Sequence, residues 1–133
     1  MAARLSCYPT SEYSHAIKCV LKTLFVCSAN RWRSPTAEKV FAAHAGIDVR
    51  SRGLSRAARR RLKGADLEWA DVILVMEDDH HDRLLEHHRD ALQSKPVHVL
   101  DIPDEYRFMA PELVEMLEVA VTPILEAHLA KRG

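Results

Sequence analysis

Apolar and polar positions follow two different periods along most of the chain. Short, β-prone apolar segments predict strands at residues 23–26, 48–51, 71–76 and 96–100. Amphipathic segments predict helices at residues 35–45, 79–93 and 111–131, with one short helical turn at 67–69. This alternation predicts an α/β fold of three layers, in which helices flank a doubly wound, four-stranded parallel sheet.

Single residues add detail to this prediction. The run Val72-Ile73-Leu74-Val75 is apolar throughout, which is typical of a strand covered on both faces. Gly46 is expected to cap the first helix at its C-terminus, and Pro123 predicts a kink or break in the last helix. Because ligands bind beyond the carboxyl ends of strands in such sheets, Cys27 and residues 101–106 are expected at one rim.

Length, composition and charge restrict the class of protein. The 133 residues suffice for one domain with a substantial core, and the formal net charge of zero argues against nucleic acid or an anionic membrane as a partner. No apolar run approaches the roughly 18 residues of a membrane span, so none is predicted. Lys18 and Lys22 interrupt the apolar stretch near the N-terminus, so no secretory signal is predicted either. Three cysteines, a low and odd number, suit the cytoplasm, which is the predicted location.

Residues 1–21 differ from the rest of the chain because they show no usable periodicity. They are predicted to form a poorly ordered N-terminal extension. The domain itself is predicted to span residues 22–133.

The candidate chemistry lies where the first strand gives way to the first helix. Cys27 and Arg33 enclose five residues, and Ser34 follows at once. Loop amides at a helix N-terminus form a concave anion site, and the planar fork of Arg33 matches two phosphate oxygens. The same field favours a thiolate at Cys27, and Ser34, as helix N-cap, can offer its hydroxyl to the sulfur. The alternative is a buried structural cysteine beside a solvated arginine.

Residues 24–38 resemble the phosphate-binding loop of the low-molecular-weight protein tyrosine phosphatases, and residues 49–55 and 70–77 are similar to the second and third strands of that family. The resemblance implies that Cys27 is the nucleophile and that Arg33 binds the phosphoryl group. It also implies that Asn30 belongs to a hydrogen-bond network bracing the loop, supported by Ser51. The remaining residues of the implied phosphate-binding loop are Ser28, Ala29, Arg31, Trp32 and Ser34.

The family uses an aspartate in a late loop as general acid, and two aspartates compete for this role. Asp104, with Tyr106 two residues later, fits the family pattern best, although Glu105 replaces the usual proline. Asp101, at the end of the fourth predicted strand, is the rival. Tyr106 is expected on the rim of the site.

Three departures from the family limit what the resemblance implies. Ala29 stands where glycine is common, so the loop has less backbone freedom. Trp32 replaces a second cysteine and could instead form one wall of the pocket. Only fourteen residues separate Ser55 from Ala70, far fewer than usual, and this stretch normally supplies an aromatic wall. A shallower cleft should follow, which makes specificity for tyrosine less secure than phosphatase chemistry.

The resemblance therefore implies a cysteine-dependent phosphatase that hydrolyses phosphomonoesters through a phosphocysteine intermediate, with no metal or organic cofactor. Its substrate would be a phosphorylated protein, chiefly at phosphotyrosine, or a small aryl phosphate. The alternatives are an arsenate reductase, which needs further cysteines, a phosphocarrier, which needs neither Arg33 nor Asp104, and a non-catalytic phosphate-binding module.

Two charged segments have simpler interpretations. The histidines between His80 and His88 are spaced unsuitably for a metal site and are expected on a solvated helix face. The arginines between Arg56 and Arg61 are expected to be solvated, with a rim that attracts phosphorylated or acidic substrates as the alternative.

Overall fold

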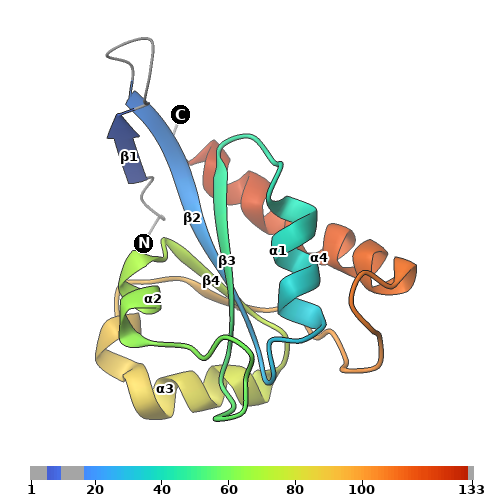
Figure 1. Ribbon diagram of the computed structural model, residues 1–133. Coiled ribbons are helices and arrows are strands. Elements are labelled where there is room, and N and C mark those ends of the chain that lie inside the picture. Colours follow the sequence, from blue (N-terminus) through green and yellow to red (C-terminus); the bar gives the residue numbers. More distant parts are fainter. Residues whose placement is uncertain (1–5, 10–16, 132–133) are drawn as a thin grey trace.

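The computed structural model describes residues 6–9 and 17–131 and has an α/β architecture (Figure 1). Four parallel strands, in the order β3–β2–β4–β5, form the sheet. They are β2 (Ile17–Cys27), β3 (Ile47–Gly53), β4 (Val72–Val75) and β5 (Val97–Val99). The predicted four-stranded parallel sheet is therefore confirmed.

The first strand of the sheet is longer than predicted. It begins at Ile17 because its first four residues pair with an additional antiparallel strand, β1 (Ser6–Pro9), before residues 21–27 pair with β3. Residues 1–5 and 10–16 of the predicted extension lie outside the described residues. The domain boundary at residue 22 stays a prediction.

Helices cover both faces of the sheet, as a doubly wound fold requires (Figure 1). They are α1 (Arg33–Phe41), α2 (Gly64–Trp69), α3 (Asp78–Leu92) and α4 (Pro111–Ala130). Helices α1 and α4 lie on one face, and α2 and α3 lie on the other. None of the helices in the described ranges is long and apolar enough to cross a membrane.

Two apolar clusters hold these layers together. On the first face, Phe25 stacks on Phe41 with ring centroids 5.9 Å apart. Helix α4 adds a buried stripe with a spacing of four residues, made of Leu113, Leu117, Val121 and Leu125. On the second face, Leu24 and Val26 pack in one cluster with Leu67 of α2 and Leu84 of α3. All four residues of β4 are buried, as predicted for a strand covered on both faces.

Two details of the helices differ from the expectations. Of the kink or break expected at Pro123, the break does not occur: α4 continues through Pro123, because the residue is exposed and the carbonyl it deprives of a partner belongs to Val119, which is 71% exposed. Helix α1 ends at Phe41, so Gly46 is not its cap. Gly46 instead adopts a φ of 81° in the turn before β3, and its carbonyl accepts a hydrogen bond from Leu21.

Candidate active site

The loop between β2 and α1 wraps around the sulfur of Cys27. Cys27 ends β2 and is only 2% exposed, and α1 begins six residues later at Arg33. Asn30 adopts a left-handed conformation, with a φ of 54°, and its backbone N–H points at Sγ of Cys27 at 3.3 Å. Asparagine tolerates this conformation better than most residues, and Ala29 is not required to adopt it. The loop therefore closes without a glycine.

Ser34 contacts the cysteine from a different position than predicted. The helix begins two residues earlier than predicted, with Trp32 as its N-cap, so Ser34 lies in the first turn and the predicted N-cap role was wrong. Its Oγ nevertheless lies 2.9 Å from Sγ of Cys27 and accepts a hydrogen bond from Nδ2 of Asn30 at 2.9 Å. A hydroxyl that accepts from Asn30 is well placed to donate to a thiolate.

Asn30 is the centre of a buried network that braces the loop. Its Nδ2 also donates to Oγ of Ser51 at 3.0 Å, the pairing that the resemblance implied. Arg60 completes the network by donating from Nε to Oδ1 of Asn30 at 3.2 Å and from Nη2 to Ser51 at 2.8 Å. Glu38 of α1 accepts from Arg60 at 2.6 Å and from Ser51 at 3.0 Å. Neither Arg60 nor Glu38 was identified from the sequence.

The segment after β3 packs closely against the phosphate-binding loop. A Cβ on Gly53 would lie 2.7 Å from the carbonyl oxygen of Ser28 and 2.6 Å from Cβ of Ala58, so only glycine fits. The backbone N–H of Ser55 donates to that same carbonyl at 2.9 Å, and Arg59 donates from its backbone to the carbonyl of Ala29 at 3.0 Å. The short segment between β3 and α2 thus serves as a support for the loop.

Arg33 is buried beside the loop and is held in one orientation. Its side chain is 2% exposed, and Nη1 donates to Oε2 of Glu77 at 2.6 Å and to the carbonyl of Ile102 at 2.9 Å. Among the residues that the structure describes, none accepts a hydrogen bond from Nη2. One edge of the guanidinium is therefore anchored by protein and the other is open to a ligand.

Glu77 and His80 tie the start of α3 to the same loop. The hydrogen bond from Arg33 lowers the pKa of Glu77 despite partial burial, so its carboxylate stays charged. Burial and the charge of Arg33 lower the pKa of His80, which favours a neutral imidazole. Since Nδ1 of His80 accepts from the backbone of Glu77, its Nε2 carries the proton and donates to Oγ of Ser28 at 2.8 Å.

The late loop brings one of the two candidate aspartates to Arg33. Oδ1 of Asp104 lies 3.6 Å from Nε of Arg33. Asp101 is exposed, with a φ of 56°, and makes no hydrogen bond or ion pair with any described residue. The loop is fixed at both ends, because Ile102 donates to the carbonyl of Met76 at 2.9 Å and Met109 donates to Oγ1 of Thr36 at 2.9 Å.

The remaining predicted residues lie around this centre. Tyr106 is half-buried against the core that α1 and α4 share. Arg31 and Trp32 are exposed on the loop, Trp32 at 39%. In the described ranges, no group of three or more His, Cys, Asp or Glu side chains could hold a metal ion.

Several solved structures share this architecture. Wzb from Vibrio vulnificus, in complex with benzylphosphonate, is 23% identical, with a TM-score of 0.66 over 81% of this chain and 99% of that chain. The YwlE arginine phosphatase from Geobacillus stearothermophilus is 22% identical, with a TM-score of 0.61 over 84% and 92% of the two chains. The low molecular weight protein tyrosine phosphatase from T. tengcongensis is 20% identical, with a TM-score of 0.61 over 85% and 99%.

No protein-family model matches the chain, and no curated protein sequence matches it significantly. At these identities the structural likeness establishes the fold. The chain has the fold of the low molecular weight protein tyrosine phosphatases, as the resemblance of residues 24–38 implied.

Proposed function

We propose that this protein is a cysteine-dependent phosphatase that hydrolyses phosphomonoesters through a phosphocysteine intermediate. The observation that carries the proposal is the convergence of three groups on one loop. Sγ of Cys27 accepts a hydrogen bond from the backbone N–H of Asn30 and lies 2.9 Å from Oγ of Ser34. Arg33 is buried, with one edge of its guanidinium open to a ligand, and its Nε lies 3.6 Å from Oδ1 of Asp104. A thiolate, an oxyanion clamp and a proton donor are the three groups that the reaction needs.

In the first step, the Cys27 thiolate attacks phosphorus in line with the leaving oxygen. The S–P bond forms while the P–O bond to the leaving group breaks. Loop amides and the open edge of Arg33 stabilise the charge on the three equatorial oxygens. Asp104 gives its proton to the departing oxygen, which leaves as an alcohol or phenol.

In the second step, the deprotonated Asp104 accepts a proton from water. The water oxygen attacks phosphorus, the S–P bond breaks, and inorganic phosphate leaves with the Cys27 thiolate restored. Ser34 assists both steps by donating to the sulfur when it carries negative charge. No metal or organic cofactor enters this sequence of steps.

The proposed substrate is an aryl phosphate, with phosphotyrosine in proteins as the natural form. The structural neighbours are described as tyrosine phosphatases and as an arginine phosphatase, so a phosphorylated amino-acid side chain is the shared substrate class. Trp32, 39% exposed on the loop, is proposed as one wall of the cleft.

Two alternatives receive less support. An arsenate reductase would need a second cysteine near Cys27, but Cys19 lies eight residues earlier on the same strand, roughly 26 Å away at about 3.3 Å per residue. A non-catalytic phosphate-binding module or a phosphocarrier would not need the aspartate that contacts Arg33.

The experiment is a turnover assay on phosphotyrosine peptides, phosphoarginine peptides, phenyl phosphate and an alkyl phosphate. We expect release of phosphate from the aryl esters by the wild type and none by Cys27→Ser. Release from phosphoarginine in preference to phosphotyrosine would redirect the substrate assignment, and activity that survives Cys27→Ser would refute the mechanism.

A further inference from the structure

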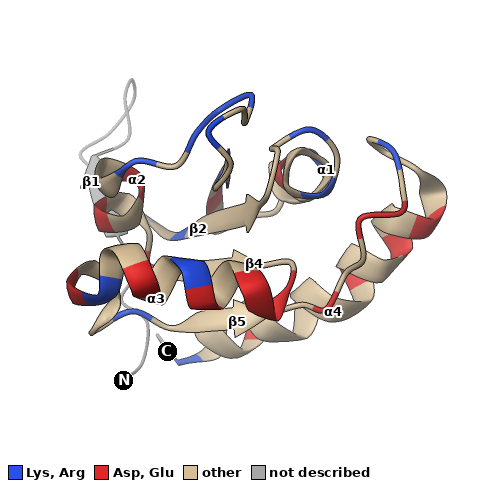
Figure 2. Ribbon diagram, turned by 90° about the horizontal axis from the view of Figure 1, so that it is seen from below, with Lys and Arg blue, Asp and Glu red and all other residues tan. Residues whose placement is uncertain are grey.

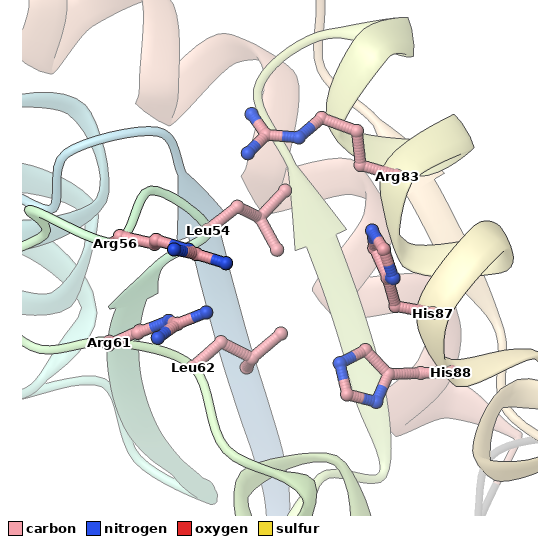
Figure 3. A pocket seen from close by; sticks show the side chains of 7 residues that line it. All are labelled: Leu54, Arg56, Arg61, Leu62, Arg83, His87 and His88. Carbon is pink, nitrogen blue, oxygen red and sulfur yellow. The ribbon is translucent and has the colours of Figure 1, made fainter.

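A basic pocket lies outside the Cys27 site, between the segment after β3 and helix α3. Its volume is about 360 Å³. This basic pocket is lined by Leu54, Arg56, Arg61, Leu62, Arg83, His87 and His88 (Figure 3). None of them is acidic, although the chain as a whole has no net charge. Lys and Arg residues gather on the segment that leads into α2, across from α3 (Figure 2).

The arginines of this segment divide into two groups with different surroundings. Arg59 and Arg60 are hydrogen-bonded to Asn30 of the phosphate-binding loop. Arg56 and Arg61 are exposed and make no hydrogen bond or ion pair with any described residue. Their guanidinium groups face the pocket (Figure 3), so their donors are available to a ligand.

The opposite wall is shaped by a distortion of helix α3. His88 has a φ of −138° and a ψ of 31°, which are not helical values. Successive residues of a regular helix point about 100° apart. Because the helix kinks here, the imidazoles of His87 and His88 both point toward the pocket (Figure 3). Arg83, one turn earlier, has Asp79, at 3.8 Å, as its single ion-pair partner among the described residues.

The lining defines the chemistry of a ligand. Three guanidinium groups with no carboxylate among the lining residues favour an anion with two or more charges, and planar guanidinium forks match phosphate oxygens. Leu54 and Leu62 form an apolar floor between the two walls (Figure 3). The volume lies at the small end of the range for organic ligands, about 300–1,000 Å³.

We propose that the basic pocket binds a phosphate or diphosphate group on a small ligand, held by Arg56, Arg61 and Arg83, with the carbon part of the ligand on Leu54 and Leu62. This site is separate from the Cys27 site, and binding of a phosphate group there does not require the proposed phosphatase activity. The two are neighbours, because the backbone N–H of Leu54 donates to the carbonyl of Cys27 at 3.0 Å. The phosphate could belong to a free metabolite or to a second phosphate of the substrate.

The test is calorimetric titration with methylenediphosphonate, which cannot be hydrolysed. We expect two sites on the wild type. Arg33→Ala should remove one, and the double variant Arg56→Ala/Arg61→Ala should weaken the other at least tenfold. A matched control, Lys39→Ala/Arg89→Ala, removes the same charge from exposed positions outside the pocket and should leave both sites intact. Thermal melting checks that each variant is folded.

The proposal is overturned if the double variant at Arg56 and Arg61 binds like the control, or if the wild type has one site that Arg33→Ala abolishes. A further arm separates the sources of the phosphate, using singly and doubly phosphorylated peptides on Cys27→Ser. Tighter binding of the doubly phosphorylated peptide, lost in the double variant, assigns the pocket to the substrate. Equal binding of both peptides, with the diphosphonate still bound at the pocket, assigns it to a free ligand.

Discussion

Arg60 donates a hydrogen bond from Nε to Oδ1 of Asn30 at 3.2 Å, and this contact joins the segment after β3 to the loop around Cys27. Asn30 has the only side chain that reaches both Ser34, beside the sulfur, and Ser51 on β3 in the described part of the chain. The orientation of Asn30 therefore depends on Arg60, since the arginine fixes which end of the amide accepts.

Replacing Arg60 should loosen the loop. We expect Arg60→Gln to lower the free energy of unfolding by roughly 1 to 2 kcal/mol, since hydrogen bonds to charged groups are lost from a partly exposed site. We also expect kcat to fall, with a smaller effect on KM. Urea unfolding and steady-state kinetics measure both effects. The control Arg89→Gln removes an exposed arginine of α3 and should change neither quantity. If the two variants behave alike, Arg60 does not brace the loop.

Arg33 should not tolerate replacement by lysine. Lysine keeps the charge but cannot contact Glu77 and the carbonyl of Ile102 while presenting a second pair of donors to phosphate. We expect Arg33→Lys to lose roughly 10² to 10³ in kcat, the usual effect of removing a donor to an oxyanion. Near-normal rates with phenyl phosphate would show that Arg33 is not the clamp.

The assignment of the general acid can be tested through the leaving group. A proton donor matters most when the leaving group is poor, so Asp104→Asn should slow phenyl phosphate by roughly 10² to 10⁴ and an activated nitrophenyl ester less. Asp101→Asn should have a milder effect through loop geometry. If the steep dependence on the leaving group follows Asp101→Asn instead, the two assignments must be exchanged.

Acid should destabilise the protein through a pair of histidines. His98 of β5 and His128 of α4 lie with their Nε2 atoms 2.9 Å apart, and Nδ1 of His128 is buried without a hydrogen-bond partner in the described structure. Burial, followed by the positive charges nearby, lowers the pKa of both groups below the ordinary value of 6.5. The unfolded chain then binds more protons than the folded protein. The stabilisation is therefore fully present above about pH 6.5, and it is lost as the pH falls through the lower pKa values of the folded state.

The measurement is urea unfolding at about pH 7.5 and about pH 5, on either side of the ordinary histidine pKa. We expect the wild type to lose stability at the lower pH and His128→Leu to lose less. The control His44→Gln should follow the wild type. An equal loss in His128→Leu would remove the pair from the explanation.

The sequence was sufficient for the four parallel strands and for the loop, because both depend on local pattern. Continuous apolar runs predict buried strands, and the spacing of Cys27 and Arg33 predicts a strand–loop–helix anion site. The ends of elements were less predictable, since β2 is extended by pairing with β1 and α4 continues through Pro123 by facing it to solvent.

Apart from the pairing of Asn30 with Ser51, the long-range side-chain contacts of the site could not be predicted. Arg60 lies in a run of arginines whose composition does not differ from that of a solvated segment. Only the path of the chain after Gly53 turns Arg60 toward the loop and leaves Arg61 exposed. The contacts of His80 with Ser28 and of Glu77 with Arg33 could not be predicted either, because the turn from β4 into α3 determines that these side chains face the loop rather than solvent.

The most direct test of the proposed mechanism is detection of a phosphoryl group on Cys27. Asp104→Asn should slow hydrolysis of the phosphocysteine intermediate, since the same carboxylate activates the attacking water. Acid quenching of that variant during turnover of a nitrophenyl ester, followed by mass spectrometry of its peptides, should find one phosphoryl group on the peptide that contains Cys27 and none on Cys27→Ser. Continued turnover with Cys27 unmodified at every quench time would contradict the account.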